Sequence, residues 1–288
     1  MAHALIRAAC RAAVRSQSEG VPMRFLYLSI PLSLCIHTAC AAQNEPDENS
    51  LHGTIYVAPI IAPDYVGSDE YRVTPFGGFQ LQYKQFFLRT EGSGLVANLL
   101  PIDHVMLGPA ANFRIGRRPK DIKSVAIGAL GEIDDAWEVG GFAGLGFPDL
   151  MTPGDTFEIT AKALFDVSDV HEGYTIQPAI TYRVPVSRSL TLGFGVNATY
   201  GDDAYMNRYF GVDTDGAFAS GLPVYSAEGG FQDVGVLING NFSLGGGLGL
   251  FGAAGYNKLL GDAKNSPIVA IEGDSNQFFG SAGISFSF

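Results

Sequence analysis

The sequence has very few of the residues that support covalent chemistry or disulfide frameworks. Its three cysteines lie within the first 40 of 288 residues, at Cys10, Cys35 and Cys40. The chain beyond them therefore has no thiol chemistry and no disulfide framework.

Histidine is almost as scarce, and catalytic motifs are missing. Beyond residue 41 the chain has only His52, His104 and His171, with no GxSxG elbow and no HExxH pair. The stretch 247–252 fits GxGxxG, but no helical pattern follows it, and this context argues against a dinucleotide site. We therefore expect no enzyme activity and no cofactor.

Charge is low and its balance is acidic. Charged residues make up only 16% of the chain, whereas glycine occurs 37 times. Glycine interrupts helices but fits bulges and crowded pleats, so the composition favours β structure. Without residues 1–41 the chain keeps 14 basic and 28 acidic residues, a net charge of −14. Such a surface is not expected to bind nucleic acid.

The N-terminal region has the pattern of an export signal. From Met23 it reads MRFLYLSIPLSLCIHTACAAQ, with Arg24 before an apolar run at 25–36 and small residues after it. The run is too short to span a bilayer as a helix and predicts a cleaved secretory signal peptide. Met23 is the expected start, with a longer n-region over 1–22 as the alternative. A lipoprotein at Cys40 is a less favoured interpretation.

Beyond residue 50 apolar residues alternate with polar or small ones. In SLTLGFGVNATY (189–200) the apolar residues occupy one face, and Thr, Gly and Asn occupy the other. Such period-two segments indicate half-buried strands, and here they reach the roughly 9–11 residues that a tilted strand needs to cross a bilayer. We predict an all-β fold, a transmembrane antiparallel up-and-down β-barrel. The chain is divided into a leader (1–42), a linker (43–52) and the barrel (53–288).

The pattern predicts twelve strands, an even number as in bacterial single-chain barrels. Ten is the alternative, because the strand within 92–100 is short. Short turns alternate with longer loops, which is typical of an outer-membrane barrel with periplasmic termini. The predicted strands lie near 53–61, 74–83, 85–91, 95–100, 105–116, 136–147, 156–166, 173–184, 189–200, 232–243, 247–258 and 277–288.

The chain ends abruptly in the strand-like sequence GSAGISFSF (280–288). A closed barrel must pair its last strand with its first, since an open edge in lipid leaves backbone groups unsatisfied. Phe286 and Phe288 resemble the C-terminal signature that barrel-assembly machinery recognises. We therefore expect this machinery and outer-membrane lipid as partners, and the Gram-negative outer membrane as the location.

Parity along the strands places seven charged residues inside the barrel. A salt-bridged plug in a narrow barrel is the favoured interpretation, and a water-filled pore whose selectivity these charges set is the alternative. The seven residues are Arg89, Glu91, Arg114, Glu138, Glu158, Lys162 and Arg183.

Two further groups of polar residues are candidate sites. His104 and His171 should lie on opposite rims, which disfavours a shared catalytic site. An acidic loop offers carboxylate oxygens to a calcium ion, but solvated aspartates are the expected explanation, and we predict no metal site. Its residues are Asp202, Asp203, Asp213 and Asp215.

Three loop stretches carry a family resemblance. They read PDYVGSDEYRVTP (63–75), YFGVDTDGAFASGLPVY (209–225) and LLGDAKNSPIV (259–269). In this order they resemble the MipA/OmpV family, the outer-membrane MltA-interacting protein group. Turn formation and loop shape explain most of these residues better than ligand binding does. The motif positions are Pro63, Tyr65, Gly67, Ser68, Tyr209, Phe210, Ser220, Gly221, Leu222, Tyr225, Gly261, Asp262, Ala263, Ser266 and Pro267.

The resemblance implies a role as well as a fold. It implies a scaffold or structural protein of the cell envelope, with a lytic murein transglycosylase and a penicillin-binding protein as partners. A passive porin-like channel or small-solute transporter is the alternative function.

Overall fold

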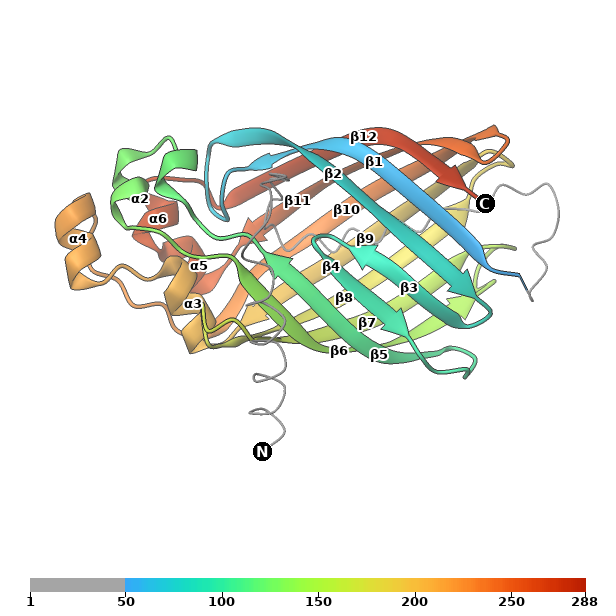
Figure 1. The fold of residues 1–288 in the computed structure, drawn as a ribbon, viewed down its shortest axis with the longest axis horizontal. Helices are drawn as coiled ribbons and strands as arrows, with labels where there is room; N and C mark the ends of the chain where they lie inside the picture. The colour runs from blue at the N-terminus through green and yellow to red at the C-terminus, as the bar shows by residue number, and fades with distance from the viewer. Residues whose placement is uncertain (1–49) are drawn as a thin grey trace, which may run out of the picture.

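A computed structural model describes residues 50–288 (Figure 1). The predictions for the signal peptide, the start at Met23 and a lipoprotein at Cys40 lie outside the described residues. None of the helices within residues 50–288 is both long enough and apolar enough to cross a membrane.

Twelve antiparallel strands close into one barrel, as the sequence predicted, and the ten-strand alternative is wrong. Each strand pairs with its sequence neighbours, and β1 pairs with β12. The strands are β1 (His52–Pro63), β2 (Tyr71–Tyr83), β3 (Phe86–Glu91), β4 (Gly94–Asn98), β5 (Val105–Arg114), β6 (Ala136–Pro148), β7 (Thr156–Asp166), β8 (Tyr174–Pro185), β9 (Leu190–Gly201), β10 (Gly230–Gly245), β11 (Leu248–Leu259) and β12 (Asn276–Ser287).

The terminal residue takes part in closing the barrel. Gly53 N donates to Phe288 O at 3.0 Å, and Phe288 N donates to Gly53 O at 2.9 Å. The backbone pairing of the last strand with the first therefore extends to Phe288. Phe286 and Phe288 point outward, as their parity predicts.

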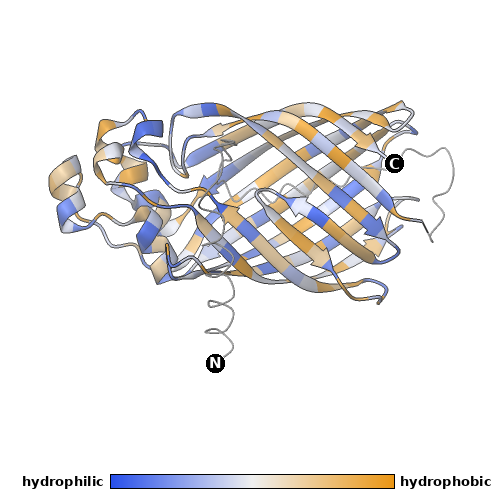
Figure 2. Ribbon diagram, viewed as in Figure 1, coloured by the Kyte–Doolittle hydropathy of each residue, from blue (hydrophilic) through white to orange (hydrophobic). Residues whose placement is uncertain are grey.

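Side-chain alternation sorts residues into an outer and an inner face. On β9, Phe194 and Val196 lie on the outer face and are about half exposed, whereas Thr191 and Thr199 point inward and are buried. Figure 2 shows hydrophobic and hydrophilic residues alternating along the strands. Because no second apolar layer within residues 50–288 covers the barrel, these outward side chains suit contact with lipid.

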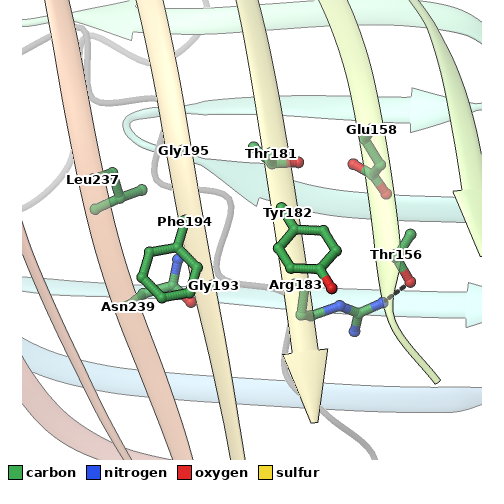
Figure 3. A pocket seen from close by; sticks show the side chains of 10 residues that line it. All are labelled: Thr156, Glu158, Thr181, Tyr182, Arg183, Gly193, Phe194, Gly195, Leu237 and Asn239. Carbon is green, nitrogen blue, oxygen red and sulfur yellow. Dashed lines mark hydrogen bonds between the residues drawn. The ribbon is translucent and has the colours of Figure 1, made fainter. Parts of the chain in front are cut away.

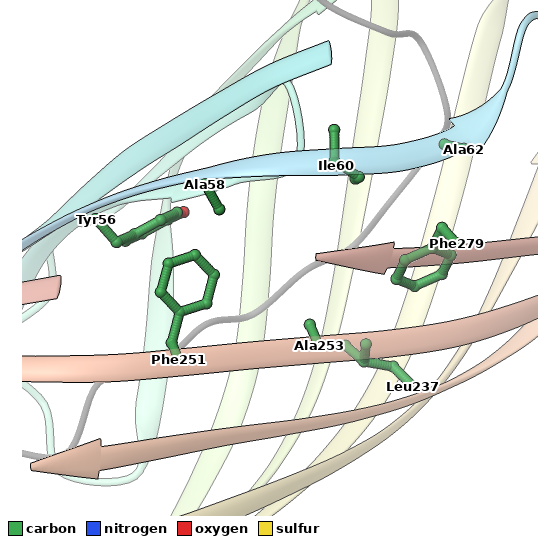
Figure 4. Close-up of a cluster of buried hydrophobic side chains, with 8 residues drawn as sticks. All are labelled: Tyr56, Ala58, Ile60, Ala62, Leu237, Phe251, Ala253 and Phe279. Carbon is green, nitrogen blue, oxygen red and sulfur yellow. The ribbon is translucent and has the colours of Figure 1, made fainter. Parts of the chain in front are cut away.

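The inner face is not polar throughout. Along β1 and β10–β12, inward side chains form an apolar cluster (Figure 4). Within it the Tyr56 and Phe251 rings meet edge to face, 5.3 Å apart. The expected separation of hydrophobic side chains outside from polar side chains inside therefore fails on this wall. Here hydrophobic interior side chains pack against one another. The cluster contains Tyr56, Ala58, Ile60, Ala62, Leu237, Phe251, Ala253 and Phe279.

The two ends of the barrel differ. One end has the turns 84–85, 99–104, 149–155, 186–189 and 246–247, which we call the turn end. The other carries the longer loops and every helix in residues 50–288, and we call it the cap end (Figure 1). Its helices are η1 (Pro119–Asp121), α2 (Val125–Ala129), α3 (Asp203–Phe210), α4 (Thr214–Ser220), α5 (Gly261–Asn265) and α6 (Pro267–Ala270).

Close packing of β6 against β7 leaves no room for a side chain at Gly140. A Cβ on Gly140 of β6 would lie 1.8 Å from the Ala163 carbonyl oxygen of β7, a backbone atom that cannot rotate away. We expect Gly140→Ala to lower the free energy of unfolding by about 1–3 kcal/mol, the usual cost of overpacking. Urea unfolding in detergent micelles measures this.

Gly252→Ala is the matched control for that substitution. Gly252 also lies inside a strand, and the nearest atom to its added Cβ is the Ser281 carbonyl oxygen at 3.8 Å, an ordinary contact. Equal urea midpoints for the two variants would contradict the packing between β6 and β7.

Candidate functional site in the barrel lumen

The predicted lumen charges all lie on inward positions of neighbouring strands. Arg89 and Glu91 lie on β3, Arg114 on β5, Glu138 on β6, Glu158 and Lys162 on β7, and Arg183 on β8. All are buried except Arg183, which is half-buried. The structure brings six of them into two ion-paired networks and leaves Arg183 apart.

The central network crosses the lumen. Lys162 Nζ lies 2.9 Å from Glu91 Oε2, and Arg89 Nη2 lies 2.9 Å from Glu91 Oε1. Arg89 Nη2 also lies 3.4 Å from Glu158 Oε2. Strands β4, β5 and β6 separate β3 from β7 along the wall, so these side chains meet through the interior. They therefore fill part of the lumen cross-section.

Aromatic rings enclose the central guanidinium. The Arg89 guanidinium lies 4.6 Å from the centroid of Phe87 and 5.8 Å from that of Phe142. Phe87 and Phe142 are themselves 6.0 Å apart, edge to face. Cation–π contacts and low solvent access both strengthen the ion pairs at this level of the barrel.

Arg183 does not join this network. Its Nη2 donates to Thr156 Oγ1 at 3.0 Å, and no carboxylate of residues 50–288 lies within 4 Å of it. Figure 3 shows it pointing toward Thr156, beside a cavity of about 10 Å³. That volume is about enough for one water molecule.

The second network lies at the cap end and centres on Glu138, which is fully buried. Arg114 forms a two-pronged ion pair with it, Nε to Oε1 at 2.9 Å and Nη2 to Oε2 at 3.2 Å. Asn112 Nδ2 donates to Oε2 at 2.6 Å. His171 Nε2 lies 3.1 Å from Oε1.

Hydrogen bonding assigns the His171 tautomer. The backbone N–H of Gly173 donates to Nδ1 at 3.2 Å, so Nδ1 has no proton. Nε2 therefore carries the proton and donates to Glu138. Such a histidine orients the carboxylate. His104 lies at the turn end, in the β4–β5 turn, so the two histidines share no site.

Helix α3 lies over Arg114 at the mouth of the barrel. The Arg114 guanidinium lies 4.8 Å from the Tyr205 ring and 5.6 Å from the Tyr209 ring. Tyr205 Oη donates to Gln232 Oε1 on β10 at 2.6 Å. A continuous chain of contacts thus runs from β5 to β10 across the mouth. Burial raises the pKa of Tyr205 and of Tyr209, so both rings are neutral near pH 7.

The sequence analysis did not predict helix α3 at the mouth, although the sequence contains a signal for it. In DDAYMNRYF, Asp202 caps the helix by accepting from Tyr205 N at 3.0 Å. Tyr205, Met206 and Phe210 fall on one helical face and are fully buried. A helix of only about two turns is not stable by itself. Its sequence therefore resembles an ordinary loop, and tertiary contacts are needed to hold the helix.

The acidic loop residues have separate structural contacts. Asp202 and Asp213 cap α3 and α4, and Asp203 Oδ1 accepts from Gly229 N at 2.6 Å. Asp215 lies in the first turn of α4. Within residues 50–288 no group of three or more His, Cys, Asp or Glu side chains is arranged to hold a metal ion.

The first motif stretch is fastened to the last strand. Pro63 ends β1, and Tyr65 Oη donates to Glu272 O at 3.4 Å. Gly67 N donates to Gln277 Oε1 at 2.9 Å, and Gln277 Nε2 donates to Ser68 O at 3.1 Å. This loop is therefore tied to the residues around β12.

The second and third motif stretches fasten to each other. Ser266 Oγ, fully buried, donates to Phe210 O at 2.6 Å, and Tyr225 Oη donates to Asp262 O at 3.0 Å. Leu222 and Ala263 are buried in the two apolar clusters of the cap. The remaining motif residues shape helix ends: Ser220 and Gly221 at the end of α4, Gly261 at the start of α5, and Pro267 at the start of α6.

At the turn end, the carboxylate of Asp155 stabilises the β6–β7 turn. Asp155 accepts backbone N–H bonds from Leu150, Met151 and Thr152 at 2.7–2.9 Å, and Tyr182 Oη donates to it at 2.9 Å. Burial acts to raise the pKa of Asp155, but these hydrogen bonds outweigh it and lower the pKa below the ordinary 3.8.

The lowered pKa predicts a pH dependence. A carboxyl whose pKa is lower in the folded state stabilises the fold above its unfolded pKa, and this contribution is lost as pH falls through the folded pKa. We expect Asp155→Asn to lower the urea midpoint above about pH 4. We also expect the difference from the wild type to shrink as the pH falls through the lowered folded pKa of Asp155. A constant difference from pH 2 to pH 7 would contradict this origin.

Comparison with known proteins identifies the family. The family model described as "MltA-interacting protein MipA" matches residues 55–288. The chain belongs to the MipA family. It is 28% identical over 122 residues to the "Putative outer membrane protein YiaT" of Escherichia coli K12 and of strain O157:H7. Each match covers 42% of this chain and 47% of that protein, so the chain spans about half the length of these curated relatives.

Among solved structures, the MipA-family chain is similar to outer-membrane barrels. It aligns with the COG4313 outer membrane channel from Pseudomonas putida F1 at 10% identity and a TM-score of 0.42, covering 85% of this chain and 99% of that one. The CymD monoaromatic hydrocarbon channel aligns at 11% identity and a TM-score of 0.40, covering 83% and 89%. The MipA-family protein is an outer-membrane β-barrel.

Proposed function

We propose that this MipA-family protein is a non-conducting scaffold of the cell envelope, not an enzyme. The observation that carries the proposal is the set of ion pairs joining β3 to β7 through the lumen. Long side chains locked in this way narrow any water path. The Arg114–Tyr205–Gln232 contacts add a second barrier at the mouth.

A scaffold needs a surface that a partner can bind, and the turn end has exposed apolar side chains that suit this role. The β4–β5 turn is tied to the end of β6, just before the β6–β7 turn, by the hydrogen bond from Gly146 N to His104 O, 2.9 Å. Exposed apolar side chains project from these turns, and Met151 is 71% exposed. The apolar residues of this surface are Leu99, Ile102, Leu150 and Met151.

Family membership supports a proposal for the partner. The family description names an MltA-interacting protein, which supports a lytic murein transglycosylase and, with it, a penicillin-binding protein as partners. Export by a cleaved signal peptide and insertion by barrel-assembly machinery, through Phe286 and Phe288, complete the proposal. With both ends of the barrel strand order in the periplasm, the turn end faces the periplasm, where such partners act.

Crosslinking in intact cells tests the scaffold role. The full-length protein should copurify with a lytic transglycosylase identified by its peptides, and Ile102→Asp with Met151→Asp should reduce the yield at least about fivefold. Val125→Asp is the matched control, because Val125 is an exposed apolar residue of the cap end. Equal recovery from both variants, or no transglycosylase in any sample, would reject the proposal.

A passive channel is the second candidate. The observation in its favour is Arg183, whose guanidinium lines a small cavity of the inner wall together with Glu158 and donates to Thr156 Oγ1 at 3.0 Å. A pore could use such a charge to select anions. Conductance measurements distinguish the two functions.

A further inference from the structure

A cavity of about 410 Å³ lies in the cap, outside the lumen networks. It lies between the β5–β6 loop, which supplies Arg117, Glu132 and Ile133, and the β9–β10 loop, which supplies Arg208, Asp213 and Tyr225 among others. Its volume falls within the range of about 300–1,000 Å³ that is usual for small-molecule sites.

Arg117 is the unusual residue of this cavity. Its side chain is 9% exposed, and its Nε is buried with no hydrogen-bond partner. No carboxylate within residues 50–288 lies within 4 Å of its guanidinium; the nearby Arg118, by contrast, pairs with Asp135 at 2.5 Å. A buried cation without a counter-ion is costly, so such sites are normally paired.

A second cation lies beside it. Arg208 of α3 lines the same cavity, and its charge helps lower the pKa of Arg117, to about 10, although burial is the larger cause. Arg117 still carries its charge at neutral pH. Two neighbouring guanidinium groups without a carboxylate repel each other unless an anion lies between them.

The acidic residues of the cavity do not supply that anion. Glu132 Oε1 lies 3.7 Å from Arg118 Nε, and Asp213 Oδ1 accepts from Gly216 N at 2.7 Å. Each carboxylate is therefore engaged on its own loop. Nearby polar groups such as Asn207 and Thr214 could contact the rest of a ligand.

We propose that Arg117 and Arg208 bind a phosphate group of a small molecule or lipid headgroup in the cap cavity. Phosphate suits the site better than a carboxylate, because a phosphate monoester carries about −1.5 to −2 charges at pH 7 and its oxygens match the planar guanidinium fork. The site lies at the end opposite the partner surface, so it is independent of the scaffold role.

Calorimetric titration of the full-length protein in detergent with inorganic phosphate tests the proposal. At constant ionic strength in chloride buffer, we expect saturable binding that Arg117→Met weakens at least about tenfold, since hydrogen bonds to charged groups contribute about that much. Arg117→Lys should also weaken binding, because it keeps the charge but loses the fork. Arg188→Met, an exposed arginine in the β8–β9 turn, is the matched control and should bind as the wild type does.

Arg208→Met guards against a folding artefact. Arg208 is exposed, so its loss should leave the barrel folded, as heat-modifiable gel mobility would verify, and still weaken phosphate binding. No saturable phosphate binding, or unchanged affinity in both Arg117→Met and Arg208→Met, would overturn the proposal.

A lipid arm separates the two sources of phosphate. The titration is repeated in phosphatidylcholine nanodiscs with and without lipid A. Loss of phosphate binding only when lipid A is present would identify a headgroup as the occupant. Undiminished binding in both would identify a soluble phosphate compound.

Discussion

Glu138→Ala will lower the free energy of unfolding by about 3–5 kcal/mol, the usual cost of breaking a buried ion pair. The substitution leaves Arg114 buried without its counter-ion and deprives Asn112 and His171 of their acceptor. Urea unfolding in detergent can be followed by the fluorescence of Trp137, the single tryptophan of the chain.

Two further variants show whether ion pairing is the cause. Glu132→Ala removes an exposed glutamate of the preceding loop and should change stability by less than about 1 kcal/mol. Removing both charges, with Arg114→Met and Glu138→Leu, should recover much of the loss, because no uncompensated charge remains. A double variant no more stable than Glu138→Ala would mean that packing, rather than unpaired charge, sets the cost.

Tyr205→Ala will detach helix α3 from the mouth of the barrel. The lost packing should lower the free energy of unfolding by about 3–5 kcal/mol. The ring is 1% exposed, lies over Arg114 and meets His171 edge to face at 5.2 Å. We expect the segment 202–229 to become sensitive to protease added to detergent-solubilised protein, while the strands remain resistant.

Tyr205→Phe is the control for this variant. It keeps the ring and loses only the hydrogen bond to Gln232, so the cost should be about 0.5–1.5 kcal/mol and cleavage of 202–229 should remain slow. Similar cleavage of the two variants would show that the hydroxyl, rather than the ring, holds α3 in place.

The barrel was predictable because its physics is local and repetitive. A side-chain period of two along long segments fixes which residues face lipid, and the closure rule requires that the last strand pair with the first. The same parity placed Arg89, Glu138 and Lys162 inside. The short strand β4, Gly94–Asn98, was the uncertain element, and it holds its place by pairing with β3 and β5.

The pairing of the lumen charges could not be predicted in the same way. Whether Glu91 meets Lys162 depends on the stagger of β3 against β7 across the barrel, and sequence spacing does not report this. Arg183 illustrates the point, since parity placed it inside but its partner is Thr156. The cap motifs likewise show their mutual contacts, such as Ser266 with Phe210, only in three dimensions.

Conductance across a planar lipid bilayer tests most directly whether side chains close the lumen. The purified wild-type protein should give no steady openings at densities where a general porin, reconstituted in the same bilayers, conducts readily. Regular, reproducible openings of the wild-type barrel would contradict the account and favour the channel.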